Sequence, residues 1–205
     1  MPQVNKIPRG RPFATSREKV GQYALQLFVE RGFDETTLDD IARGLEIGRR
    51  TLFRYFDSKN DMVWGDFDIV LQRLRDELKA RSGDASLMET LREAVIASNT
   101  YPPDAEAELR IRIELITTVP ALQAHSMLRY ADWRGVVAEF AAERLGGSAY
   151  DLVPTSLGYA ALAASTAAFV HWVTHPGANL LVLLDRTYRL MEAGFDPDAL
   201  RRQGT

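Results

Sequence analysis

The sequence contains no cysteine, and this absence excludes disulfides, thiolate catalysis and zinc sites with cysteine ligands. Its first residues, MPQVNKIPRGRP, lack an apolar stretch of the length found in secretory signal peptides. The longest apolar stretch, Leu157–Val173, approaches the length of a transmembrane helix. It is mostly alanine and is interrupted by Ser165, Thr166 and His171, which favours a helix packed against other helices. We therefore expect a cytoplasmic protein with no membrane segment.

Convincing β-strand patterns are also missing, because apolar residues recur at helical rather than alternating spacing. The sequence therefore predicts an all-α fold. A capping box of Thr15 and Glu18 is expected to open the first helix, which Gly32 ends. The next helix is expected to start at Thr36–Thr37, and a third to cover Arg49–Phe56.

A long fourth helix is expected to begin at Asp57–Ser58 and to bury a stripe from Val63 to Leu78. Proline and glycine breaks separate five further helices. These are expected at Ser86–Asn99, Asp104–Thr117, Ala121–Leu145, Pro154–His175 and Ala178–Ala193.

Acidic residues slightly outnumber basic ones overall, 28 to 25, but the balance is reversed at the N-terminal end. Residues 1–60 contain 11 Lys and Arg against 8 Asp and Glu, whereas the remainder contains 14 against 20. The segment Lys6–Pro12, KIPRGRP, is expected to form a flexible basic arm. A basic third joined to an acidic body indicates an anionic partner for the first part only.

Two short helices joined at Glu46–Gly48, after a longer helix, predict a helix-turn-helix unit. In the second short helix, Leu52 and Phe56 are spaced to face a small core. The side chains left outside are Arg49, Arg50, Thr51, Arg54 and Tyr55. Arginine fits guanine edges bidentately, and threonine can contact a base or a thymine methyl group. The hydroxyl groups of Thr37 and Tyr55 and the ammonium group of Lys59 suit phosphates.

The segment FVERGFDETTLDDIARGLEIGRRTLFRYFDSKNDM resembles the N-terminal domain of the TetR family of transcriptional regulators. Its G-F-x-x-T-T, D-I-A, T-L-F-x-Y-F and S-K-x-D elements recur at the family's spacing, over about Ser16–Trp64. The longer match GRRTLFRYFDSKNDMVWGDFD is similar to one subgroup, the regulators of mycofactocin gene clusters. By this resemblance, the positions that contact DNA are Thr37, Arg49, Arg50, Thr51, Phe53, Tyr55 and Lys59.

The resemblance also implies a DNA-binding domain at 1–60 and a ligand-binding and dimerisation domain at 61–205. A homodimer joined through the last two helices would bind a partly palindromic double-stranded operator, as a repressor rather than an activator. A small amphipathic effector, such as a long-chain acyl-CoA, would release it, with no other cofactor. The chain departs from the family pattern at Glu46, where glycine is usual, at Gly48, where serine or threonine is common, and at Arg50, where the residue is often small.

The C-terminal part has no recognisable catalytic motif. His171 and His175 have a spacing compatible with zinc, but Trp172 occupies the place of the zinc-protease glutamate. We expect two histidines at a helix end and no metal site. The first part of the last helix, Leu180–Leu184, is apolar on nearly all sides, which favours a subunit interface together with the alanine-rich helix before it.

In EAELRIRIEL, glutamates and arginines four residues apart predict an exposed, salt-bridged helix face. The alternative is that Arg110 or Arg112 binds an anionic ligand head. Candidates for the wall of an apolar ligand site are Phe67, Arg110, Trp133, Phe169 and Trp172. A rival hypothesis, favoured by the missing turn glycine, is an all-α enzyme or protein-interaction module that has lost DNA binding.

Overall fold

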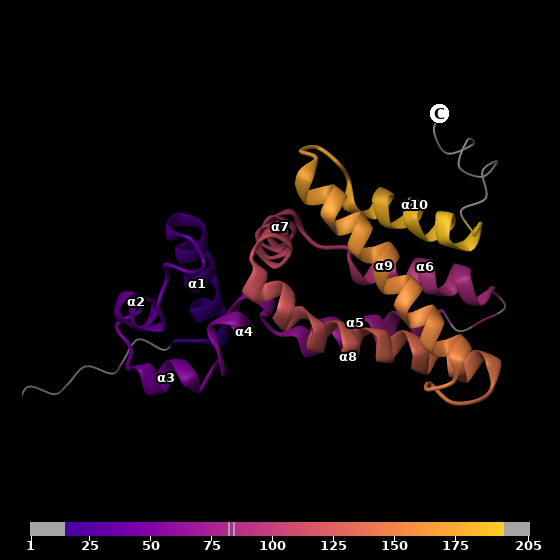
Figure 1. Ribbon diagram of the computed structural model, residues 1–205, viewed down its shortest axis with the longest axis horizontal. Helices are drawn as coiled ribbons and strands as arrows, with labels where there is room; N and C mark the ends of the chain where they lie inside the picture. Colours follow the sequence, from indigo (N-terminus) through magenta and orange to yellow (C-terminus); the bar gives the residue numbers. More distant parts are fainter. Residues whose placement is uncertain (1–14, 82, 84, 195–205) are drawn as a thin grey trace, which may run out of the picture. The chain divides into compact units, whose positions relative to one another are not determined.

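The computed structural model describes residues 15–81, 83 and 85–194, and every regular element in this part is a helix (Figure 1). This confirms the all-α prediction. The expected basic arm, Lys6–Pro12, lies outside the described residues. The helices are α1 (Arg17–Arg31), α2 (Leu38–Gly44), α3 (Arg49–Phe53), α4 (Lys59–Trp64), α5 (Phe67–Ala80), α6 (Leu87–Ser98), α7 (Pro103–Thr118), α8 (Pro120–Leu145), α9 (Leu152–Thr174) and α10 (Leu180–Glu192).

The chain forms two compact units, Met1–Met62 and Val63–Thr205. The division falls two residues beyond the boundary drawn from the sequence. Helix α4 begins in the first unit and ends in the second.

The first unit is built on α1, α2 and α3, and its helix starts depend on side-chain caps. Ser16, not Thr15, caps α1, because its hydroxyl accepts a hydrogen bond from the Lys19 backbone amide at 3.2 Å. Thr37 caps α2 in a reciprocal capping box with Asp40, as its place in the sequence predicts. The small core contains the buried side chains of Val20, Phe28, Ile41, Leu52 and Phe56.

Two predicted helices are wrong in length. Helix α3 ends at Phe53, and the chain continues to Phe56 in a turn. The expected long fourth helix is divided into α4 and α5, because Gly65 adopts a φ of +65° that stops the first segment. The apolar spacing continues across this break, and so the sequence pattern does not reveal it.

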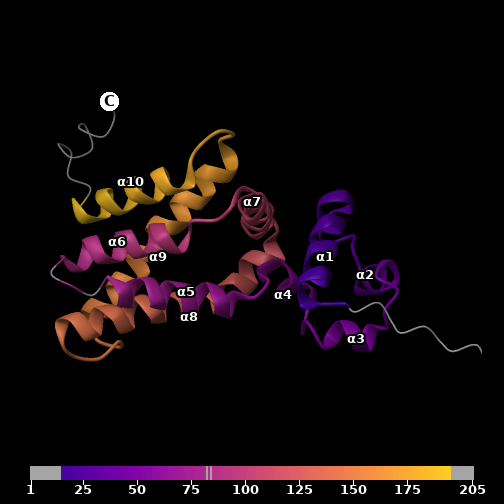
Figure 2. The same ribbon diagram turned by 180° about the vertical axis from the view of Figure 1, so that it is seen from behind.

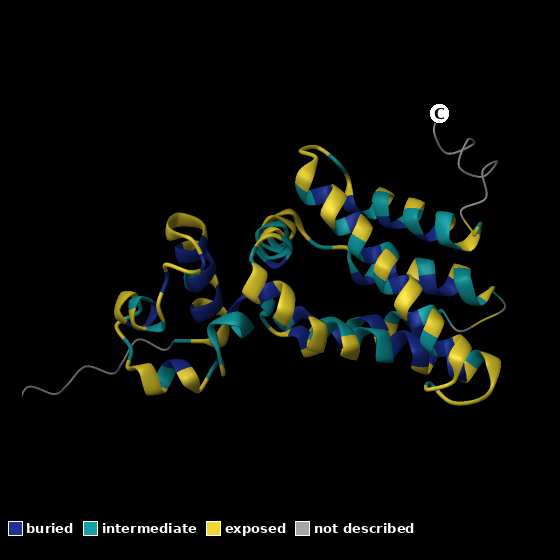
Figure 3. Ribbon diagram, viewed as in Figure 1, coloured by how far each residue is buried: buried dark blue, intermediate teal, exposed yellow. Residues whose placement is uncertain are grey.

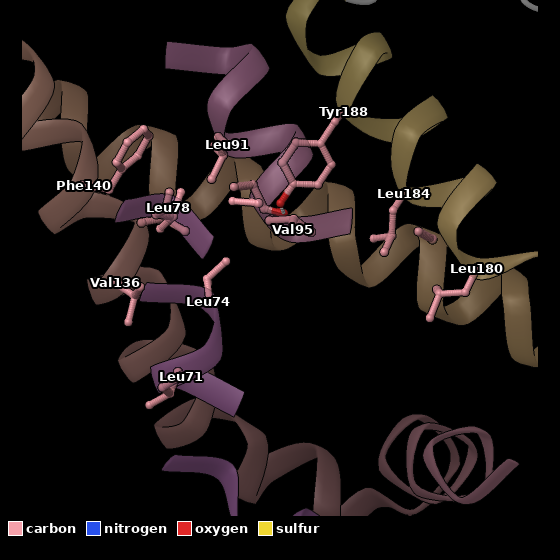
Figure 4. Close-up of a cluster of buried hydrophobic side chains, with 14 of the residues drawn as sticks. Leu71, Leu74, Leu78, Leu91, Val95, Val136, Phe140, Leu180, Leu184 and Tyr188 are labelled. Atoms are coloured by element: carbon pink, nitrogen blue, oxygen red, sulfur yellow. Dashed lines mark hydrogen bonds between the residues drawn. The ribbon is translucent and has the colours of Figure 1, made fainter. Parts of the chain in front are cut away.

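In the second unit, α8 and α10 both pack on α9, while α6 packs on α5 and α10 (Figures 1 and 2). Helix α7 packs against α8 and α9. Buried side chains from α5, α6, α8, α9 and α10 form one apolar cluster. On α10, Leu180, Leu184 and Tyr188 lie along the side that faces this cluster (Figure 4). The Tyr188 hydroxyl lies 2.9 Å from Ser165 Oγ and donates to the Ala161 carbonyl at 3.2 Å, so polar contacts fix α10 against α9.

The two C-terminal helices differ from the sequence interpretation in one respect. Helix α10 is apolar all round only in its first turns, since Asp185, Arg186 and Arg189 make its later outer surface polar. Helix α9 is the apolar one, and it is long and apolar enough to cross a membrane by length and composition alone. One side of α9 is buried in the unit and the other is exposed (Figure 3).

Candidate nucleic-acid interface

The turn between α2 and α3 is closed by backbone hydrogen bonds. The Leu45 amide donates to Ile41 O at 3.2 Å, and the Ile47 amide donates to Ala42 O at 3.0 Å. Glu46 lies between them with a φ of +53°, the left-handed conformation that glycine adopts without strain. Glu46 therefore carries backbone strain at the position where the family pattern has glycine. Gly48 precedes α3 in an extended conformation with no side-chain cap.

The glycine at position 44 has a packing reason rather than a conformational one. A Cβ atom at Gly44 would lie 1.9 Å from the hydroxyl oxygen of Tyr23 and 2.4 Å from its Cζ. The Tyr23 ring therefore lies directly against the backbone of α2, and it must move if position 44 carries a side chain. Nothing in the structure explains the glutamate at position 46, where the family pattern has glycine.

Three arginines of the α3 segment project from the first unit into solvent. Arg49, Arg50 and Arg54 are all exposed, whereas Leu52 and Phe56 are buried beneath them. Thr51 and Tyr55 are half-buried, and Phe53 is 43% exposed although it is aromatic. The segment thus has one side in the core and one side carrying cations, threonine and an exposed aromatic ring. This arrangement allows the segment to contact base edges and phosphates at the same time.

Sequence reasoning missed two side chains that organise this surface. The Asp39 carboxylate on α2 lies 3.5 Å from the Arg49 guanidinium, with both side chains more than half exposed. Arg17 on α1 donates to the Tyr55 carbonyl and lies 4.4 Å from the centre of the Phe56 ring. Arg17 therefore ties α1 to the end of the α3 segment. Neither contact has a signal in the local sequence, because both join residues distant in the chain.

Two predicted phosphate ligands are also engaged within the protein. The Tyr55 hydroxyl donates to the Thr15 carbonyl and accepts from Arg54 at 3.1 Å. Thr37 is exposed at the start of α2, and its hydrogen bonds lower the pKa of the Asp40 carboxyl. Both hydroxyl groups remain on the same unit as the α3 arginines, at the positions where the sequence pattern predicts phosphate contacts.

Lys59 is more deeply involved in the fold than the sequence suggests. Its ammonium group donates to the carbonyls of Phe33 at 2.7 Å and Thr36 at 3.0 Å, and it lies 4.2 Å from the centre of the Phe33 ring. Burial lowers the pKa of Lys59, while Asp34 and Glu35 act to raise it. These contacts hold the start of α4 against the turn between α1 and α2.

The candidate ligand residues all lie in the second unit, on α5, α7, α8 and α9. Phe67 is buried in the apolar cluster, and Trp133 and Phe169 pack partly buried against it. Trp172 is fully buried, and its indole nitrogen has no hydrogen-bond partner in the part of the chain that the structure describes. The Arg110 guanidinium lies 4.1 Å from the centre of the Trp172 ring and donates to its carbonyl at 2.7 Å.

The predicted salt-bridged face of α7 is only partly correct. Arg112 pairs with Glu108 at 2.6 Å, as the spacing predicts, but its side chain is only 15% exposed. Arg110 is also only partly exposed and turns toward α9. At the end of α9, the rings of His171 and His175 stack with centres 3.7 Å apart, and His175 Nδ1 lies 2.9 Å from the His171 carbonyl. No group of three or more potential metal ligands gathers among the described residues.

Comparison with known proteins decides the family. Residues 22–63 match the model of the bacterial regulatory proteins of the tetR family, and residues 85–196 match the MftR C-terminal domain. The chain belongs to the TetR family. Within this family, it is 36% identical over 196 residues to MftR, a candidate transcriptional regulator of mycofactocin biosynthesis from Mycobacterium tuberculosis. The alignment covers 96% of this chain and 98% of that protein, which confirms the subgroup predicted from the sequence.

Solved TetR-family structures have the same fold. FadR of Thermus thermophilus, a repressor in complex with lauroyl-CoA, has a TM-score of 0.59 and 23% identity, over 88% of this chain and 95% of that one. FadR of Bacillus halodurans, a regulator of fatty acid degradation, has a TM-score of 0.60 and 16% identity, over 87% and 99%. These relatives and structural neighbours are transcriptional regulators and not enzymes, and dimers and ligand binding are typical of the family. The chain is thus a TetR-family transcriptional regulator.

Proposed function

We propose that this regulator is a cytoplasmic repressor that binds a partly palindromic operator as a homodimer, with α3 of each subunit in a major groove. The observation that carries the proposal is the two-sided α3 segment. Its outer side exposes Arg49, Arg50 and Arg54. Its inner side buries Leu52 and Phe56 in the core of the first unit. Two copies would read half-sites about one helical turn apart, or a multiple of this distance.

The residues divide by chemistry into two roles. Arg49, Arg50, Thr51 and Arg54 suit base edges, since they carry the exposed donors of α3. Thr37, Phe53, Tyr55 and Lys59 suit the sugar–phosphate backbone; among these, Lys59 acts mainly by positioning, because two carbonyls already accept its protons. The Asp39 carboxylate would pair with Arg49 in the free protein, and Arg49 would leave it to contact DNA on binding.

The exposed side of α9 is the proposed centre of the dimer interface, with α10 beside it. Alanines at 160, 163 and 167 are exposed there, and Tyr159 and Val170 flank them. A shallow surface groove is lined by Tyr159, Leu162, Ala163, Thr166, Ala167, Val170, His171 and Thr174. Small residues allow a second helix to approach closely, and burial of this side would account for a helix that is apolar all round.

We propose a long-chain acyl-CoA, or a similar amphipathic molecule, as the effector. The apolar body is large, and the buried indole N–H groups of Trp64 and Trp172 lack partners among the described residues. Such buried donors are costly, and a carbonyl of the effector would satisfy one of them. The lauroyl-CoA bound to the structurally similar Thermus repressor supports this ligand class. Arg110 and Arg112 are not assigned to the anionic head, because carbonyls and Glu108 already accept from them.

The test is a titration of the protein against its own upstream DNA at two salt concentrations, with and without palmitoyl-CoA. We expect selective binding that weakens steeply with salt, because each neutralised phosphate releases counterions. Palmitoyl-CoA should reduce the affinity at least tenfold, whereas CoA alone should not. Selective binding whose affinity does not change with palmitoyl-CoA would contradict the proposed effector class. Binding with no sequence preference would contradict the proposal that the protein recognises an operator.

A further inference from the structure

The α3 segment has little stability of its own. Its helical part, Arg49–Phe53, has five residues, and a helix of this length is not stable without contacts to the rest of the protein. Its start at Gly48 also lacks a side-chain cap. The conformation of the segment therefore depends on tertiary contacts, and its exposed arginines keep their directions only while these contacts hold.

The end of the segment depends on a donor from another helix. The amides of Tyr55 and Phe56 donate to the Leu52 carbonyl at 3.0 and 3.2 Å. The last carbonyls of such a segment have no donor within it and need one from outside. The Tyr55 carbonyl has this donor in Arg17, at the start of α1.

Arg17 contacts the end of the segment in two ways. Its Nη1 donates to the Tyr55 carbonyl, and its guanidinium group lies 4.4 Å from the centre of the Phe56 ring. The Phe56 side chain is buried in the small core. A hydrogen bond from a charged donor is stronger than one between neutral groups, and a cation over an aromatic face adds attraction. One side chain of α1 thus holds both the backbone and the core anchor of this end.

A second contact joins the same two stretches of chain in the opposite direction. The Tyr55 hydroxyl donates to the Thr15 carbonyl and accepts from Arg54 Nη2 at 3.1 Å. The Arg54 guanidinium also lies 5.1 Å from the centre of the Tyr55 ring. The direction of Arg54, which is assigned to base edges, therefore depends on where Tyr55 is held.

We propose that Arg17 is a positioning residue for operator recognition, which fixes the end of the α3 segment so that Arg54 is directed toward the bases. Without Arg17, the Tyr55 carbonyl loses its donor from α1 and the end of the segment frays. Arg54 then samples more directions, and its contact with a base is weakened. This inference rests on the proposed function, because the role that it assigns to Arg17 is a role in operator binding.

The rival role for Arg17, an exposed cation beside this surface, is a direct phosphate contact. The two roles have different effects on DNA affinity. Loss of a phosphate contact weakens binding to every sequence about equally and lowers the salt slope by about 1. Loss of a positioning contact mainly weakens binding to the operator, because base-specific contacts form only there.

Amide hydrogen exchange measures the position of the segment without DNA. In Arg17→Gln, we expect the amides of Tyr55 and Phe56 to exchange about tenfold faster than in the native protein, because the end of the segment opens more often. The Ile41 amide, within α2, should keep its native rate. Arg17→Lys keeps a cationic donor and should give intermediate rates. Lys19→Gln is the matched control, because it removes an equal charge from an exposed position of the same helix, and it should change none of these rates.

The affinities for the operator and for unrelated DNA of the same length are then measured at several salt concentrations. We expect Arg17→Gln to lose about tenfold in operator affinity, as for one weakened base contact, and less than about threefold on unrelated DNA. The salt slope should stay close to the native one. Arg17→Lys should recover part of the operator affinity, and Lys19→Gln should keep the native ratio between the two DNAs.

Two results would overturn the proposal. One is an equal loss on both DNAs with a salt slope lower by about 1, which would make Arg17 a phosphate contact. The other is native exchange at Tyr55 and Phe56 in folded Arg17→Gln. Circular dichroism identifies a variant that fails to fold, in which case Arg17→Lys decides by the same two measurements. A native protein with no operator preference would contradict the proposed function, while the exchange rates still decide whether Arg17 fixes the segment.

Discussion

At the scale of single residues, the turn before α3 contains backbone strain that a substitution can remove. Glu46 has a φ of +53°, which costs a residue with a side chain about 1–2 kcal/mol. Glu46→Gly removes this strain but makes the unfolded chain more flexible, so we expect a net gain of about 0.5–1 kcal/mol. Urea unfolding measures it. Glu46→Ala, which keeps the Cβ, should show no comparable gain, and an equal gain would contradict strain as the cause.

Gly44 gives a second prediction, based on contact rather than conformation. Gly44→Ala places a Cβ 1.9 Å from the Tyr23 hydroxyl oxygen, so the ring must move. We expect a loss of about 1–2 kcal/mol of stability, as is typical of overpacking. In a Tyr23→Ala background the same change should be neutral or stabilising, because alanine is the better helix former. A double-mutant cycle with no coupling would show that Tyr23 is not the cause.

Some of these residue-scale features could be predicted from the sequence and others could not. The strained Glu46 and the Thr37 cap follow from local patterns, since a turn and a cap depend on neighbours in the chain. Ser16 replaces Thr15 as the first cap because two adjacent hydroxyl residues give the same sequence signal. The Tyr23 contact is invisible in sequence, since it joins two helices in space.

At the scale of helices, an ion-pair cluster joins α6 to α10. Arg92 on α6 donates to the Asp185 carboxylate, which also accepts from Arg189 Nε at 2.8 Å. Burial acts to raise the pKa of Asp185, but the hydrogen bonds from Arg189 and Arg92 outweigh it and lower the pKa below the ordinary 3.8. A carboxyl with a lowered pKa stabilises the fold above its unfolded value, and this contribution is lost as the pH falls through the folded value.

We therefore expect Asp185→Asn to cost about 1 kcal/mol at neutral pH, the upper end for partly exposed pairs. The difference from the native protein should stay constant down to about pH 5 and shrink below about pH 4, where the carboxyl of the unfolded chain binds a proton that the native one does not yet bind. Unfolding in urea across this range measures it. A difference that persists unchanged at pH 3 would mean that the charge of Asp185 is not the source.

The number and places of the later helices follow from proline and glycine breaks, which act locally. Two features of the helices do not. The break at Gly65 is hidden because the apolar spacing of α4 continues into α5. The turning of Arg110 and Arg112 into α9 and α4 is hidden because their i,i+4 glutamates offer an equally good partner in the isolated helix.

At the scale of the whole molecule, the proposed dimer depends on α9. Ala163→Arg adds a long cation to an exposed position, so the monomer should fold normally while the interface is blocked. We expect light scattering to change from twice the chain mass of 23.0 kDa to that mass. Ala131→Arg, on the exposed side of α8, is the control and should stay dimeric. A dimeric Ala163→Arg would place the interface elsewhere.

The central claim is that the exposed arginines of α3 bind DNA. Its most direct test compares operator affinity in the native protein, in an Arg49→Ala, Arg54→Ala double variant and in Arg186→Ala, an exposed arginine of α10. Each base-contacting arginine contributes about 1–3 kcal/mol, so the double variant should lose at least 100-fold in affinity and approach non-specific binding. Arg186→Ala should bind as the native protein does. A folded double variant that keeps its operator affinity within twofold would contradict the assigned surface.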